Sequence, residues 1–184
     1  NYHYVDSLSE ARKVLVEEMT GTLVTIAKDV KIQVEFNPAK VAGYRLIGYE
    51  NRTMAAEDFN NDKKDAGEIG AGHTVTALYE ITPTGAAASV DPLRYGRRSP
   101  PAATALAGEL AFLKIRYKLP GQAQSHLISR PITRADAAPS LAAAPEPTRW
   151  AVAVAGFGQK LRRDPRVADA FDWSDIVRLA QTGR

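Results

Sequence analysis

The residues that could do chemistry gather in one acidic stretch, DFNNDKKDAGEIGAGH, over residues 58–73. Carboxylates and imidazoles bind divalent metals and act as general acids and bases in hydrolysis. The stretch could therefore form a metal site, a hydrolytic site, or only a polar connection between two strands. The candidate side chains are Asp58, Asp62, Asp65, Glu68 and His73.

The spacing of this stretch matches a calcium-binding loop only in part. When Asp58 takes position 1 of an EF-hand loop, oxygen-bearing side chains also occupy positions 3 and 5. Position 6, which requires glycine for a sharp turn, is Lys63, and position 12, which requires a bidentate Glu, is Ile69. Because the turn and the ligand that completes the charge are both missing, the spacing argues against an EF-hand site.

A zinc or acid–base site around His73 would need ligands from distant parts of the chain. A catalytic zinc usually has three protein ligands, and the other histidines are His3 and His126. The chain has no cysteine, which excludes disulfides, thiolate ligands and cysteine nucleophiles. The glycines before His73 lead into a predicted strand, not a helix, so they do not form a phosphate-binding loop. We expect His73 to open a strand and to hydrogen-bond the preceding loop.

The composition predicts a folded domain without a nucleic-acid surface. The 184 residues are 45% hydrophobic, and 24 basic residues against 21 acidic ones give a net charge of +3. No apolar run reaches the roughly 18 residues of a membrane span. Two basic clusters lack the interleaved aromatic residues that stack on bases, so we interpret them as solvated faces, with acidic partners or lipid headgroups as the alternative. They comprise Arg94, Arg97 and Arg98, and Lys160, Arg162, Arg163 and Arg166.

Several segments have the alternation, or the β-branched and aromatic composition, of strands. They are residues 30–36, 43–50, 73–82, 109–119 and 125–133, and residues 22–27 could add a short one. In the first of them, VKIQVEF, the alternation places Lys31 on the wet face and Ile32 on the buried face. Because no helix separates these strands, the sequence predicts a mainly β chain with some α, built on an antiparallel, immunoglobulin-like β-sandwich.

Helical patterns occupy both ends of the chain. Near the start, Ser7 and Glu10 form a capping box for a helix that ends before Gly21. Near the end, one apolar stripe at helical spacing comprises Trp150, Val154, Phe157 and Leu161. A last helix is capped by Asp172 and Asp175, and its predicted buried face comprises Trp173, Ile176, Val177 and Ala180.

Three long stretches closely resemble the C-terminal region of bacterial YfbK-like von Willebrand factor type A (VWA) domain proteins. They are TIAKDVKIQVEFNPAKVAGYRLIGYENR, DFNNDKKDAGEIGAGHTVTALYEI and AVAVAGFGQKLR. The resemblance covers most of the chain. It implies that residues 1–21 are a remnant, the last strand and helix, of an upstream VWA domain. The β-sandwich domain would then span residues 22–133, with long loops at 51–72 and 83–108, followed by a linker at 134–147 and a helical tail at 148–184.

The resemblance also shapes the expected function. The metal-binding D-x-S-x-S loop of the VWA domain would lie upstream, so it implies no cofactor and no metal ligand among these residues. It implies no enzymatic activity for this region and a periplasmic or membrane-anchored parent protein, whose only membrane contact would be an N-terminal anchor. We expect a non-enzymatic accessory module that binds other proteins or positions the VWA domain, through a surface including Arg45, Tyr49 and Arg52. The alternative is a metal-binding or hydrolytic module that uses the acidic stretch.

Overall fold

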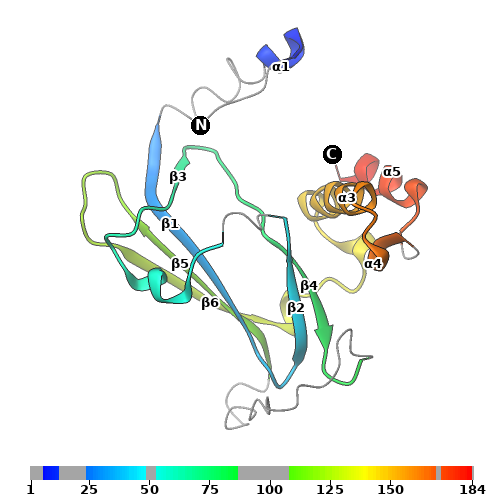
Figure 1. Cartoon of the computed structure of the whole chain (residues 1–184), viewed down its shortest axis with the longest axis horizontal. Helices are drawn as coiled ribbons and strands as arrows, with labels where there is room; N and C mark the ends of the chain where they lie inside the picture. The colour runs from blue at the N-terminus through cyan, green and yellow to red at the C-terminus, as the bar shows by residue number, and fades with distance from the viewer. Residues whose placement is uncertain (1–5, 13–23, 49–52, 87–107, 169–170, 184) are drawn as a thin grey trace. The chain divides into compact units, whose positions relative to one another are not determined.

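A computed structural model of the chain describes residues 6–12, 24–48, 53–86, 108–168 and 171–183 (Figure 1). The fold is mainly β with α: it has a four-stranded and a two-stranded antiparallel sheet and C-terminal helices. This confirms the predicted fold class and is consistent with a β-sandwich. The strands are β1 (Thr25–Phe36), β2 (Val41–Ile47), β3 (Gly67–Gly70), β4 (Leu78–Pro83), β5 (Glu109–Lys118) and β6 (His126–Thr133).

The helices are mostly short and lie at the two ends of the chain. They are α1 (Leu8–Arg12), α3 (Glu146–Leu161), α4 (Pro165–Ala168) and α5 (Trp173–Thr182), with 3-10 helices η3 (Ala56–Asn60), η4 (Arg134–Asp136) and η5 (Leu141–Ala143). Among the described residues, no helix has the length and apolar character needed to cross a membrane. The predicted linker thus contains two 3-10 helices, η4 and η5, of which η4 is closed by a capping box between Thr133 and Asp136.

Some predicted features lie outside the described residues. These are the strand expected within residues 1–21, most of the first helix, and most of the loop at 83–108 with its three arginines. The described residues divide into two compact units, and each unit is described by itself. The first comprises Asn1–Glu35, Met54–Val75 and Phe112–Pro131, and the second comprises Phe36–Thr53, Thr76–Ala111 and Ile132–Arg184. The predicted boundaries near residues 21, 133 and 147 stay a prediction.

The four-stranded sheet has the strand order β3-β1-β5-β6. Strand β1 joins the predicted segments 22–27 and 30–36 into one strand of 12 residues. Strand β6 forms an edge of this sheet, where Pro131, which has no N–H to donate, is tolerated. Strand β3 pairs antiparallel with β1, from Thr25↔Gly70 to Val30↔Gly67, inside a segment predicted to be a loop. Its sequence GEIG has little strand propensity of its own, so the pairing with β1 determines its conformation.

The predicted alternation of β1 is wrong at its centre. Lys31, expected on the wet face, is 3% exposed, whereas Ile32, expected in the core, is exposed. The register against β3 shifts between Ala27 and Val30, and Asp29 has a positive φ of 50°. This irregularity interrupts regular pairing, and the groups that surround Lys31 are polar, as the next subsection describes.

In the second unit, β2 and β4 form an antiparallel ribbon (Figure 1). The pairing runs from Val41↔Pro83 to Ile47↔Leu78, and Val41 is buried. The Phe36 ring lies 4.5 Å from the Tyr44 ring and 5.3 Å from the Tyr79 ring, measured between centroids. The strand predicted at 73–82 therefore begins only at Leu78.

Helices α3 and α5 pack against each other in the second unit (Figure 1). Gly156 of α3 lies against Phe171 and Ile176, and a side chain at Gly183 would collide with the backbone of Trp150. The helices therefore run in opposite directions. The predicted capping box of α5 is confirmed, because Asp172 and Asp175 bond each other's backbone N–H groups.

The buried faces of these helices differ from the prediction. The buried residues of α3 and α5 are Ala153, Ile176 and Leu179, together with the polar Gln159. In contrast, Trp173 and Val177 are exposed, so only part of the predicted face of α5 is buried. The stripe on α3 has the predicted spacing, but Val154, Phe157 and Leu161 are each about half exposed or more. The Phe157 ring also packs edge-on against Trp173 of α5, with 5.9 Å between the ring centroids.

Candidate functional site

The acidic stretch is built around Lys31 of β1. The buried Lys31 ammonium group donates to two backbone oxygens, Asp58 O at 3.1 Å and Asn61 O at 2.5 Å. Each carbonyl also accepts one backbone N–H, Asp58 O from Asn61 at 3.2 Å and Asn61 O from Lys64 at 3.1 Å, so Lys31 supplies a second donor to both. Lys31 thus links the backbone of the first turn of the loop to strand β1.

Lys118 of β5 hydrogen-bonds to the next part of the loop. Its ammonium group donates to Asp29 Oδ2 at 2.7 Å and to the backbone oxygen of Asp62 at 2.6 Å. The hydrogen bond from Lys118 holds the pKa of the Asp29 carboxyl below its usual value. Hydrogen bonds from Ser125 lower the pKa of Asp62, whose Oδ2 accepts from the Ser125 backbone N–H at 3.2 Å. Both carboxylates are therefore held in their charged form at neutral pH.

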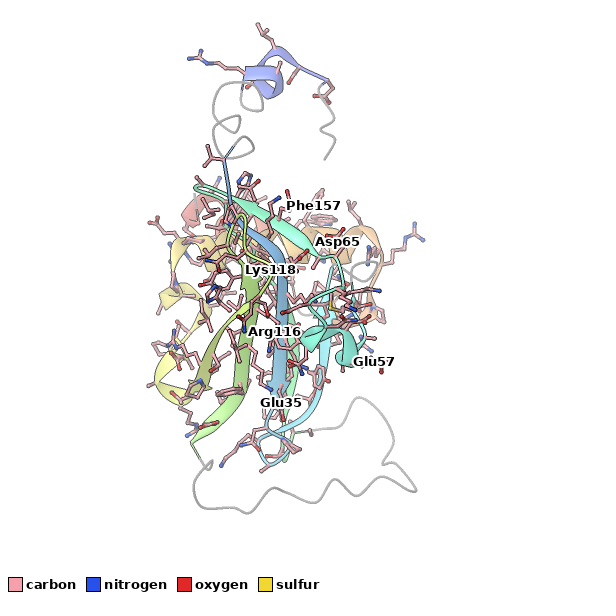
Figure 2. The ribbon with its side chains drawn as sticks, turned by 90° about the vertical axis from the view of Figure 1, so that its left-hand side faces the viewer. Glu35, Glu57, Asp65, Arg116, Lys118 and Phe157 are labelled. Atoms are coloured by element: carbon pink, nitrogen blue, oxygen red, sulfur yellow. The ribbon has the colours of Figure 1, made fainter. Side chains whose placement is uncertain are left out.

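Arg116 of β5 makes the third connection to the loop. Its Nη2 donates to Asn60 Oδ1 at 3.0 Å, and its Nη1 donates to Ser125 Oγ at 2.8 Å. The guanidinium also lies over the Phe59 ring, 5.6 Å from its centroid. Phe59 is buried and anchors η3 as the apolar part of the loop. Figure 2 labels Arg116 and Lys118 together with Asp65 of the loop.

The five predicted site residues do not converge on one point. Asp58 forms an ion pair with Lys64 at 3.4 Å, and Glu68 lies 3.6 Å from Lys28. The side chain of Asp65 is exposed, and so is that of His73. Within the described residues, no three acidic or histidine side chains could hold a metal ion together.

His73 itself lies outside any strand. Its backbone N–H donates to Gly70 O at 3.1 Å, so the predicted hydrogen bond to the preceding loop is present. The prediction that His73 opens a strand is wrong, because β4 begins five residues later, at Leu78. The turn before His73 contains Gly72, whose φ of 80° suits glycine.

Of the three residues predicted to form an interaction surface, the structure describes Arg45. Its Nε donates to Glu80 Oε2 at 2.6 Å, and its Nη1 donates to Asp164 Oδ2 at 2.5 Å. The contact with Arg45 lowers the pKa of Asp164. Arg45 therefore ties α4's leading turn to the β2–β4 ribbon within the second unit. Tyr49 and Arg52 lie outside the described residues.

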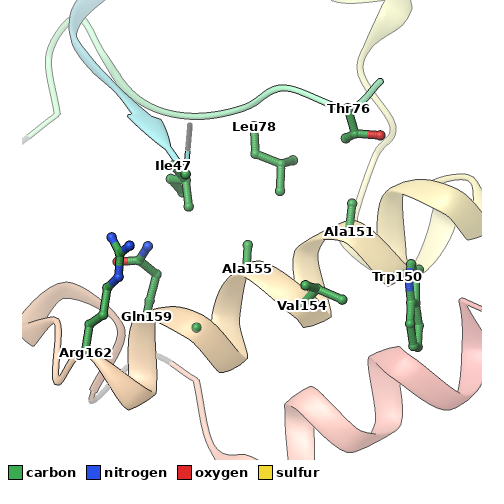
Figure 3. Close-up of a pocket in the computed structure, with 11 residues that line it drawn as sticks. Ile47, Thr76, Leu78, Trp150, Ala151, Val154, Ala155, Gln159 and Arg162 are labelled. Carbon is green, nitrogen blue, oxygen red and sulfur yellow. The ribbon is translucent and has the colours of Figure 1, made fainter. Parts of the chain in front are cut away.

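A cavity of about 410 Å³ lies in the second unit, between the β2–β4 ribbon and α3 (Figure 3). Ile47 and Leu78 form one wall, and Ala151, Val154 and Ala155 form the other. Its volume falls within the range of small-molecule and peptide pockets. The cavity offers apolar surface for binding and no cluster of acid–base groups.

Comparison with known proteins assigns the chain to a family. The family described as "Uncharacterized protein YfbK, C-terminal" matches residues 21–184. The chain belongs to this family. It is 47% identical over 184 residues, the whole of its length, to "Uncharacterized protein YfbK" of Escherichia coli (strain K12). No solved structure matches the chain.

The YfbK match also sets the scale of the parent protein. The chain spans 31% of the length of the Escherichia coli relative. The family description and this coverage together make the chain the C-terminal region of a larger protein. The resemblance noted from the sequence is confirmed at the level of the YfbK C-terminal family.

Sequence reasoning missed the residues that hold the acidic loop together. These are Lys31, Arg116 and Lys118, with Phe59 as the apolar anchor. A signal was present in β5, where Lys114, Arg116 and Lys118 recur at every second position. Such a row places three cations on one face of a strand, where they need acceptors. The acidic stretch supplies acceptors to two of them.

Proposed function

We propose that this region is a non-enzymatic accessory module of a bacterial VWA-domain protein, which binds other proteins or positions the VWA domain. The observation that carries the proposal is the exposed apolar stripe of α3. Val154 is 53% exposed, Phe157 48% and Leu161 63%, although they follow one another on a single helix face. Contiguous exposed apolar residues on a soluble domain mark binding surfaces more often than isolated ones do.

The state of the acidic stretch supports a role without catalysis. Its backbone oxygens at Asp58, Asn61 and Asp62 accept from lysine groups of the same unit, and Asp62 Oδ2 accepts from Ser125. A general base or metal ligand needs free acceptor atoms that face a common point. The proposal therefore places any divalent metal of the parent in the VWA domain and none in this region.

The proposed setting follows from the family resemblance. The parent protein would be periplasmic or anchored in a membrane at the bacterial cell envelope, and its partners would be proteins rather than nucleic acids. The modest net charge of +3 supports the second point, because nucleic-acid-binding domains usually carry a much stronger positive face.

The test uses the full-length parent protein and a pair of surface substitutions. Val154→Glu with Leu161→Glu places charges on the stripe, and Thr148→Glu places one on an exposed position of the same helix. We expect the double variant to retain at least about tenfold less co-purified protein, or to have a measurably larger hydrodynamic radius than the parent protein. Its melting curve should stay unchanged. Identical co-purified proteins and an identical radius in both variants would contradict the proposal.

A further inference from the structure

The face of α3 that lines the cavity is made mainly of small residues. Ala151, Ala155 and Gly158 recur at i, i+4 and i+7, so they lie on one side of the helix. A Cβ atom placed on Gly158 would meet no described atom outside the neighbouring helix backbone within 4 Å. The cavity therefore exists because this face carries little side-chain volume opposite Ile47 and Leu78 (Figure 3).

Gln159 places a carboxamide in this otherwise largely apolar space. The residue is 8% exposed, and Figure 3 shows its side chain on the side of α3 that faces Ile47. Among the described residues, the carboxamide has no hydrogen-bond partner. Burying an amide without a partner costs free energy, and nearly all buried polar groups in folded proteins are hydrogen-bonded. Gln159 therefore marks a point at which a bound molecule would gain hydrogen bonds.

The groups around Gln159 restrict the chemistry of that molecule. A carboxamide has an oxygen that accepts and an NH2 group that donates, so its best partner carries an acceptor and a donor side by side, as another amide does. Arg162 also lines the cavity, but it already has an interaction partner within the chain, so it gives no reason to expect a charged ligand. The other walls are mainly apolar, and a volume of about 410 Å³ suits a small molecule.

We propose that the cavity beside α3 binds a small neutral molecule that pairs an amide group with Gln159 and places an apolar body between α3 and the β2–β4 ribbon. The N–H of the ligand would donate to Gln159 Oε1, and Gln159 Nε2 would donate to the ligand carbonyl. The apolar body would remove Ile47 and Leu78 from water, which favours binding. The inference goes beyond the proposed function, because it concerns the cavity and not the exposed side chains of Phe157 and Leu161.

The test compares an amide with the matching ester by saturation-transfer NMR on the full-length parent protein. N-benzylacetamide and benzyl acetate have the same apolar body, but the ester has an oxygen in place of the N–H. We expect the wild type to bind the amide about tenfold more tightly, because the ester leaves Gln159 Oε1 buried without a donor. Titration of the transferred signal gives the two dissociation constants and their ratio.

Two variants and a control assign the binding to the cavity. Gln159→Leu keeps a side chain of similar size without the carboxamide, so the preference for the amide should fall below about twofold. Ala155→Leu fills part of the cavity and should weaken the binding of both compounds at least about fivefold. Gln181→Leu, at an exposed position of α5, should keep the wild-type affinities and preference. Gln159→Leu should melt at a temperature no lower than that of the wild type, because no hydrogen bond among the described residues is lost.

Several results would overturn the inference. Absence of saturation transfer to both compounds would leave water as the partner of Gln159. Equal affinities of the wild type for the amide and the ester would exclude the carboxamide from recognition, and a preference that persists in Gln159→Leu would place binding at another site. A lower melting temperature of Gln159→Leu would mean that the carboxamide is bonded within the protein. Each of these results leaves the co-purification test of the proposed function unaffected.

Discussion

The acidic loop of the first unit and the α3 face of the second differ in how their side chains find partners. The loop is polar, yet Lys31, Arg116 and Lys118 of the same unit donate to Asp58 O, Asn60 Oδ1, Asn61 O and Asp62 O. The α3 face is apolar, yet Val154 and Leu161 stay exposed. A region that looks reactive in the sequence is thus largely hydrogen-bonded within its own unit, and a region that looks like core keeps exposed apolar side chains. Exposed surface, more than charge, points to the binding site.

The largest effect should come from the part of the helical region that is buried. Ile176→Ala should lower the free energy of unfolding by about 3 kcal/mol, because Ile176 is 6% exposed and its removal leaves a cavity against Gly156. Urea unfolding followed by fluorescence reports on this region directly, since both tryptophans of the chain lie in α3 and α5.

The neighbouring residue provides the control. Val177→Ala, at an exposed position of α5, should change the free energy of unfolding by less than about 0.5 kcal/mol. A loss at Val177 as large as that at Ile176 would mean that the outer face of α5 is covered within this chain.

Lys31→Met should destabilise the acidic loop by about 2 kcal/mol. The substitution removes the donor to Asp58 O and Asn61 O and leaves both carbonyls partly buried. Trypsin should then cut after Lys63 or Lys64 faster than in the wild type, while tryptophan fluorescence in the second unit stays the same. Lys40→Met, at an exposed lysine, is the matched control. Unchanged cleavage would show that the loop does not depend on Lys31.

Acid should weaken the polar region through its aspartates. The pKa values of Asp29 and Asp62 are lower in the folded chain than the value of about 3.9 expected when unfolded. Their contribution is therefore complete above about pH 4 and is lost as the pH falls through the lower, folded values. Urea unfolding between about pH 6 and pH 2 should show this loss as a fall in the free energy of unfolding. In Asp29→Asn, that free energy should fall less steeply with decreasing pH. An equally steep slope in the variant would exclude Asp29 as a source.

Calcium should have the smallest effect, close to none. Because three backbone carbonyls of the loop already bind lysine groups and its candidate ligands do not face one point, added calcium at about 1 mM should not shift the melting temperature. The same holds for magnesium and zinc in a calorimetric titration. Binding tighter than about 0.1 mM that disappears in Asp62→Ala or Asp65→Ala would restore the metal-binding alternative.

The sequence predicted the elements of regular period well. The strands at 109–119 and 125–133 and the last helix with its Asp172 cap appear close to their predicted bounds. In each case a local pattern is sufficient, because alternation, a turn residue or a capping box acts within a few residues. The fold class follows from the order of such elements.

The candidate site could not be predicted in the same way. The position of Lys31 depends on an irregularity at Asp29 and on acceptors about 30 residues further along the chain. The exposure of the α3 stripe depends on what covers it, and the spacing of Val154, Phe157 and Leu161 is identical for a core face and a docking face. Periodicity shows which residues share a face and leaves the neighbour of that face open.

The positions of Lys31 and Lys118 in the acidic loop have a wider consequence. In calcium loops, a mobile ion gathers backbone and carboxylate oxygens; here two covalently attached ammonium groups do so, one binding two carbonyls and the other a carboxylate and a carbonyl. An ion that belongs to the polypeptide cannot be removed by a chelator or diluted away. The loop should keep its shape when divalent cations are added or removed.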